Sequence, residues 1–114
     1  MAAIKRVSIK PCLPILIGFL ALPLMAQEQS LTARSLAATC AGCHGTNGNA
    51  VTGSGIETLA GSPKEMLLKK LQDFRADTKP ATIMNQISKG YSEEQLALIA
   101  EYFSTQKPKK AAQK

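Results

Sequence analysis

The chain has 114 residues, a formal net charge of +6, three cysteines, one histidine and no tryptophan. This length indicates a single domain, and the few aromatic residues leave little material for an apolar core of its own. The basic excess gives little support to nucleic-acid binding, because its clustered part is a C-terminal tail without interleaved aromatic residues.

Residues 1–26 have the pattern of a secretory signal peptide. Basic residues come first, an apolar run over 13–25 follows, and the small residue Ala26 comes next. The run is too short to span a bilayer, which takes ~20 apolar residues. We therefore expect export to the periplasm and cleavage after Ala26, with an uncleaved membrane anchor as the alternative.

Cleavage at this position changes the charge and the cysteine count. It removes 26 of the 114 residues and leaves 88, and it takes three of the fourteen basic residues and none of the eight acidic ones. The net charge thereby falls from +6 to +3. Cys12 leaves with the leader, so the exported chain keeps one pair of cysteines.

The first helix of the mature chain is predicted from Ser30 to about Ala41. Ser30 is a residue type typical of an N-cap, and apolar residues then recur at helical spacing. Leu36 and Cys40 are four positions apart and therefore share a face. The cysteine motif begins on the last turn of this helix, and Gly42 is expected to provide the turn after it.

The motif Cys40-Ala41-Gly42-Cys43-His44 carries the chemistry. Two thiols three positions apart, followed directly by an imidazole, are typical of c-type haem attachment, with the histidine beneath the iron. A C-x-x-C pair also occurs in dithiol oxidoreductases and, when a second pair is present, in zinc sites. No second pair remains here, and a helix precedes the motif. We therefore predict one covalently bound haem c, with a haem-free dithiol and then zinc as the alternatives.

Residues 45–61 are predicted to form a loop, because they contain five glycines and no apolar period. They match neither of the glycine-rich nucleotide-binding patterns. The loop is expected to pass close to His44, where a backbone carbonyl between Gly53 and Ile56 would accept the ring N–H and fix the tautomer.

A second helix is predicted from Ser62 to about Ala76. Ser62 would be the N-cap, Pro63 the first helical residue and Glu65 the partner in a capping box. The predicted buried stripe is Leu67, Leu68, Leu71 and Phe74, and the predicted exposed residues are Lys64, Lys69, Lys70, Gln72 and Asp73.

Two further helical segments complete an all-α chain. One or two turns are expected between Thr82 and Gly90, with Gly90 as the C-terminal cap. The last helix should begin at Ser92, which forms a capping box with Gln95. Its core-facing stripe is predicted to be Leu96, Ile99, Ala100 and Phe103.

The second axial ligand of the iron has to come from a methionine or, less favourably, a lysine, since the only histidine and both mature cysteines are already used. Met66 and Met84 remain after cleavage. Met66 lies early in a capped helix, whereas Met84 follows a loop broken by proline, so we favour Met84 over Met66 and over an empty position. Histidine and methionine together favour electron transfer, since no coordination position stays open for a substrate.

The sequence resembles the class I c-type cytochromes of small bacterial type over nearly all of the mature chain. The resemblance is carried by the helix ending in the motif, by Thr82-Ile83-Met84, and by Ala100-Glu101-Tyr102-Phe103 in the closing helix. It implies the class I cytochrome c fold, in which three main helices and a short helix wrap around one haem. It also implies that the first and last helices cross and that Met84 is the distal ligand.

The run from Thr82 to Ser92 is also similar to the haem subunit of flavocytochrome c sulfide dehydrogenase. In one place the chain departs from the family. Many relatives have a Gly-Pro pair in the loop after the motif, where this chain has Gly53-Ser54-Gly55. Without a proline the loop is expected to be more mobile.

These features predict a signal peptide over 1–26, a cytochrome c domain over 27–106 and a basic flexible tail over 107–114. The expected function is periplasmic one-electron transfer by a protein that is not itself an enzyme. The alternatives are the cytochrome subunit of a flavin-containing sulfide dehydrogenase complex and a haem-free dithiol oxidoreductase. The expected partners are redox proteins, with no nucleic acid and no stable membrane insertion after cleavage.

Overall fold

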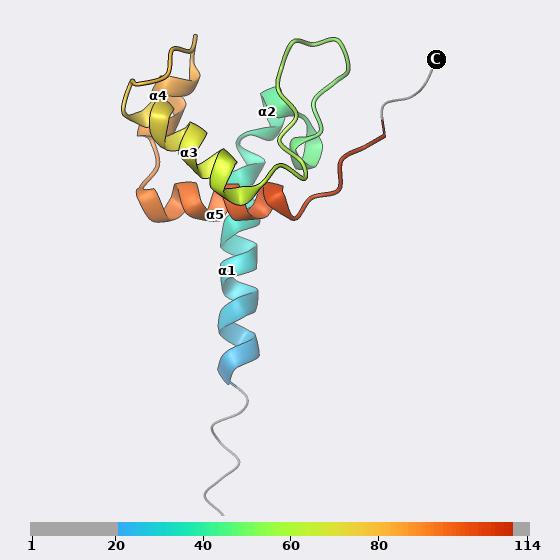
Figure 1. Ribbon diagram of the computed structural model, residues 1–114. Helices are drawn as coiled ribbons and strands as arrows, with labels where there is room; N and C mark the ends of the chain where they lie inside the picture. Colours follow the sequence, from blue (N-terminus) through green and yellow to red (C-terminus); the bar gives the residue numbers. More distant parts are fainter. Residues whose placement is uncertain (1–20, 111–114) are drawn as a thin grey trace, which may run out of the picture.

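The computed structural model describes residues 21–110, which form an all-helical structure (Figure 1). In chain order the elements are α1 (Ala21–Ala38), α2 (Ala41–His44), the 3-10 helix η1 (Thr46–Gly48), α3 (Lys64–Arg75), α4 (Met84–Lys89) and α5 (Glu93–Ser104). The predicted fold class is confirmed. The three main helices are α1, α3 and α5, and the short helix is α4, which begins at the predicted distal ligand Met84.

The first helix begins well before the predicted position. Ser30 is not an N-cap but an interior residue of α1, where its hydroxyl donates to the carbonyl of Gln27 at 2.8 Å. The residues before it are mostly good helix formers, so nothing stops the helix from continuing upstream across Ala26. Residues 1–20, which include most of the predicted signal peptide, lie outside the described residues.

The core forms where α1 and α5 cross, as the resemblance implied (Figure 1). The N-terminal half of α1 extends away from the other helices, and among residues 24–38 the buried ones are Ala33 and Ala37. These small side chains let α5 approach closely. The predicted stripe of α5 is confirmed, since its members are all buried: Leu96, Ile99, Ala100 and Phe103.

The helix starts of α3 and α5 differ in how well they follow the prediction. Ser92 and Gln95 form both bonds of the predicted capping box at the start of α5. The predicted Ser62 cap of α3 is wrong. Pro63 is the N-cap, with an extended ψ of 134° and no side-chain hydrogen bond. Its carbonyl accepts the N–H of Leu67 at 3.0 Å, which completes the first turn through the backbone alone.

The loop after the motif packs closely against α5 at Gly48. The carbonyl of Gly48 accepts the N–H groups of Leu59 and Ala60, at 2.8 and 3.1 Å, which folds the loop back on itself. Gly48 has a φ of 76°, and a Cβ there would lie 2.6 Å from Cδ1 of Phe103. A glycine is therefore required for the loop to lie against the core.

The described part of the C-terminal tail is also attached to this loop. Asn49 donates to the carbonyl of Lys107 at 3.2 Å and accepts the N–H of Lys109 at 2.6 Å. The side chains of residues 107–109 are exposed, but hydrogen bonds with Asn49 hold the backbone there. Residues 111–114 of the predicted flexible tail lie outside the described residues.

Candidate functional site

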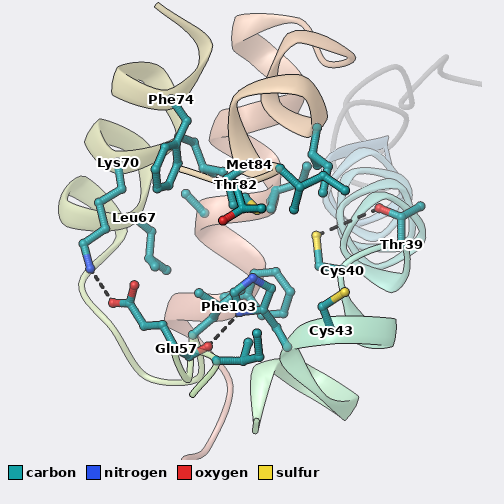
Figure 2. A pocket seen from close by; sticks show the side chains of 18 of the residues that line it. Thr39, Cys40, Cys43, Glu57, Leu67, Lys70, Phe74, Thr82, Met84 and Phe103 are labelled. Atoms are coloured by element: carbon teal, nitrogen blue, oxygen red, sulfur yellow. Dashed lines mark hydrogen bonds and ion pairs between the residues drawn. The ribbon is translucent and has the colours of Figure 1, made fainter. Parts of the chain in front are cut away.

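A cavity of about 330 Å³ lies among α2, the 45–61 loop, α3, α4 and α5. All four residues predicted to bind the cofactor line it: Cys40, Cys43, His44 and Met84. Most of the remaining wall is apolar and includes Leu59, Leu67, Leu71, Phe74, Ile87 and Ile99. Figure 2 shows the thiols of Cys40 and Cys43 across the cavity from Leu67 and Phe74.

A single helical turn brings the motif residues together. The carbonyl of Cys40 accepts the N–H of Cys43 at 3.3 Å and the N–H of His44 at 2.9 Å. Gly42 lies inside this turn with no positive φ, so the expectation that it turns the chain is wrong. Gly45 turns the chain instead, with a φ of 78°, directly after the histidine.

The imidazole of His44 is held by a backbone carbonyl. Its Nδ1 lies 2.7 Å from the carbonyl oxygen of Glu57. A carbonyl can only accept, so Nδ1 carries the proton and Nε2 keeps a lone pair for a metal. The predicted acceptor between Gly53 and Ile56 is wrong by one residue. In a glycine-rich segment no side-chain pattern distinguishes one carbonyl from the next.

Burial raises the pKa of the Cys40 thiol, and the negative charge that Cys43 can carry raises it further, while a hydrogen bond with Thr39 opposes both effects. The Thr39 hydroxyl lies 3.9 Å from the Cys40 sulfur. Reactive dithiols have a lowered thiol pKa, because the thiolate is the nucleophile. Cys40 therefore does not resemble the attacking thiol of a dithiol oxidoreductase.

The two candidate methionines have different surroundings. Met84 is the first residue of α4 and lines the cavity, half-buried. Met66 on α3 is 42% exposed and does not line the cavity. The thioether available to the cavity is therefore that of Met84.

The donor groups at the cavity fit haem c. Two thiols can form the thioether links, and one imidazole and one thioether suit the axial positions of an iron that already has four ring nitrogens. Within residues 21–110, no group of three or more histidine, cysteine or acidic side chains is arranged to hold a metal ion by itself. This chemistry suits a haem and gives no support to the zinc alternative.

Two residues near the site, Lys70 and Glu57, were not predicted from the sequence. Lys70 was expected on the exposed face of α3, yet it lines the cavity and its side chain is only 28% exposed. Glu57 supplies both the carbonyl for His44 and a carboxylate that pairs with Lys70 (Figure 2). Helical spacing could have placed Lys70 on the same face as Leu67, three positions before it, and Phe74, four positions after it, but no pattern pointed to Glu57.

None of the helices that the structure describes has the length and apolar character needed to cross a membrane.

Comparison with known proteins identifies the family. The family model described as cytochrome c matches residues 32–107. The cytochrome subunit of sulfide dehydrogenase from Chlorobaculum tepidum is 43% identical over 68 residues, which cover 60% of this chain and 60% of that protein. Cytochrome c4 from Azotobacter vinelandii is 37% identical over 81 residues, covering 63% of this chain and 38% of that protein.

A third relative, the thiosulfate dehydrogenase electron acceptor from Thiomonas intermedia, is 33% identical over 72 residues, covering 63% of this chain and 33% of that protein. The chain therefore spans less than two thirds of the length of each of these relatives. The family match takes in both cysteines of the motif, the cavity and the crossing of α1 with α5. The chain belongs to the cytochrome c family and is an electron-transfer protein that carries covalently bound haem c.

Proposed function

We propose that the protein is a periplasmic one-electron carrier in which Cys40 and Cys43 hold the haem and His44 and Met84 are the axial ligands of its iron. The observation that carries this proposal is that all four side chains line one apolar cavity. The hydrogen bond from Nδ1 of His44 to Glu57 supports it, since it leaves Nε2 as the coordinating atom.

Each of these residues has a distinct role. The bound haem supplies reversible exchange of one electron between the ferric and ferrous states. His44 binds as the neutral imidazole, and its bond to a carbonyl raises its basicity. The thioether of Met84 favours the ferrous state and so raises the reduction potential. With His44 and Met84 both bound to it, the iron would keep no coordination position for a substrate, which suits a carrier.

The periplasmic location rests on the sequence pattern of residues 1–26. Cleavage after Ala26 shortens α1 but leaves its buried residues, Ala33 and Ala37, in the mature domain over 27–106. The intact mass of the haem protein isolated from the periplasm tests the cleavage site, and a mass that includes residues 1–26 would contradict it.

A second candidate function is that of a cytochrome subunit that takes electrons from a flavoprotein. The 43% identity to the cytochrome subunit of a sulfide dehydrogenase favours it. The two functions differ in how the protein is isolated: a free carrier purifies alone, whereas a subunit purifies with a flavin-containing partner and is reduced when that partner receives sulfide.

Replacement of Met84 by alanine tests the axial ligation, with Met66→Ala as the matched control. We expect Met84→Ala to lower the reduction potential and to let added imidazole bind the iron, because the thioether is lost. Met66→Ala should change neither property, since Met66 lies outside the cavity. An unchanged potential in Met84→Ala would remove Met84 from the ligand set.

A further inference from the structure

Glu57 makes two separate bonds that together connect His44 to α3. Its backbone carbonyl accepts the Nδ1–H of His44 at 2.7 Å. Its carboxylate forms an ion pair with the ammonium group of Lys70, which lines the same cavity (Figure 2). One loop residue therefore links the imidazole to a main helix of the fold.

The loop around Glu57 has little other support. Residues 51–58 are all exposed, and a Cβ at Gly53 or Gly55 would meet nothing within 4 Å. Two hydrogen bonds lie within the segment, from the N–H of Ser54 to the carbonyl of Val51 and from the N–H of Ile56 to the Ser54 hydroxyl. Among the described residues, the hydrogen bonds that join this segment to the rest of the molecule are those of Glu57.

We propose that Lys70 is a positioning residue that, through its ion pair with Glu57, holds the Glu57 carbonyl against the imidazole of His44. The ion pair takes over the restraint that a proline would give to this loop, which has none. This inference rests on the proposed role of His44 as an axial ligand. It adds that the orientation and basicity of that ligand depend on a lysine of α3.

The size of the effect follows from the exposure of the pair. The Lys70 side chain is 28% exposed and that of Glu57 is 52% exposed, so solvent and salt weaken their attraction. Loss of such a pair changes the equilibrium between the formed and the broken His44–Glu57 hydrogen bond by about two- to fivefold. The effect should therefore be measurable at the His44 ring without preventing the protein from folding.

The test compares Lys70→Gln and Glu57→Gln in the haem-containing protein, using NMR to measure solvent exchange of the His44 Nδ1 proton in the reduced state. We expect exchange to become about two- to fivefold faster in each variant. The double variant should be no faster than either single one, because the same ion pair is missing in all three.

The charges of the two residues separate positioning from simple electrostatics. Removal of a positive charge near the iron lowers the reduction potential, and removal of a negative charge raises it. A charge effect alone therefore shifts the potential in opposite directions in the two variants and leaves proton exchange unchanged. That combination would overturn the proposal.

Lys69→Gln and Asp73→Asn are the matched controls. Lys69 and Asp73 form an ion pair on α3, at 2.8 Å, that makes no bond to the loop. These substitutions remove the same charges and should leave the exchange of the His44 proton at the wild-type rate. Equal acceleration in the controls would show a general loosening of α3 and would contradict a specific role for Lys70.

The spectrum of the wild-type protein distinguishes failure of this inference from failure of the proposed function. If no iron-bound imidazole is found, both are overturned. If His44 is bound to the iron but its exchange rate does not respond to loss of Lys70 or Glu57, the axial ligation stands and the positioning role is rejected.

Discussion

The hydroxyl oxygen of Tyr91 lies 2.6 Å from Oγ1 of Thr39, the residue directly before Cys40. This bond joins the end of α1 to the connection between α4 and α5. We expect Tyr91→Phe to lower the free energy of unfolding by about 1 kcal/mol, since one hydrogen bond is lost. Thr39→Ser keeps the hydroxyl and is the control. Equal stability of Tyr91→Phe and the wild type in urea unfolding would contradict a structural role for this bond.

Substitution by alanine should have opposite effects on stability at two glycines of the motif region. A Cβ on Gly45, where φ is 78°, would lie 1.9 Å from the carbonyl oxygen of Asn49. Gly45→Ala is therefore expected to cost at least ~2 kcal/mol of stability and to reduce haem attachment.

Gly42 is the matched control, because it lies in a helical turn with nothing within 4 Å of a Cβ. Gly42→Ala should raise the free energy of unfolding by about 0.5–1 kcal/mol, because alanine lowers the backbone entropy of the unfolded chain. Denaturant unfolding and haem staining of a denaturing gel measure both effects. A Gly45→Ala protein with normal haem content and stability would contradict the assigned strain.

Asn85, the neighbour of Met84, holds the turn before α4. Its amide nitrogen lies 3.0 Å from the carbonyl oxygens of Phe74 and Lys79 and 3.2 Å from Oδ1 of Asp77. Asn85→Ala should reduce the free energy of unfolding by about 1–3 kcal/mol, because two part-buried carbonyls lose their donor. Asn85→Asp, which places an acceptor against acceptors, should cost more. If Asn85→Asp were as stable as the wild type, the assigned contacts would be wrong.

Ser88 in α4 has a fully buried hydroxyl with no hydrogen-bond partner among the described residues. Burial of an unpaired polar group is unfavourable, and alanine is the better helix former. We expect Ser88→Ala to raise the free energy of unfolding by about 1 kcal/mol, measured by thermal unfolding. A lower melting temperature would show that the hydroxyl makes a bond in solution.

The ion pair of Lys89 with Asp77 gives a pH dependence. The hydrogen bond from Lys89 holds the pKa of the Asp77 carboxyl below its ordinary value of 3.8, against a smaller opposing effect of desolvation. The folded state therefore favours the charged carboxylate. Its contribution to stability is present above pH 3.8 and is lost as the pH falls through the lowered folded-state pKa.

Comparison of the wild type with Asp77→Asn tests this dependence. Asparagine accepts the positive φ of 57° at this position and keeps an acceptor for Asn85. The wild type should have the higher melting temperature at neutral pH, and the difference should shrink as the pH falls below 3.8 and disappear once Asp77 is protonated in the folded state. Lys89→Gln should behave like Asp77→Asn. A difference that is constant with pH would exclude the ion pair as its cause.

The parts of the structure that local sequence determines were predicted well. The stripe of α5 and its Ser92 cap depend only on spacing and on residues three positions apart, so both could be read from the sequence. The cap at Ser62 could not, because the extended Pro63 satisfies the helix start through its backbone. The cysteine–histidine motif predicted the cofactor, and it contains three of the four residues expected to bind it: Cys40, Cys43 and His44.

The long-range support of the site was not predictable from the sequence. The acceptor for His44 is a backbone atom thirteen residues away, and any residue type has a carbonyl. Lys70 looked exposed because a lysine on a helix is usually solvated, whereas here its ammonium group reaches an acidic side chain of the loop. Such contacts depend on how the loop crosses α3, which local patterns do not specify.

The crossing of α1 with α5 joins the two ends of the domain in one core. Ala37 and Phe103 belong to the same core, yet they come from opposite ends of the domain. The cysteine-bearing turn follows α1 directly, so it emerges early, while the helix that completes its wall is made last. Contacts so far apart in sequence form late in folding. The cavity wall that Ile99, Ala100 and Phe103 supply is therefore complete only once α5 has packed against α1.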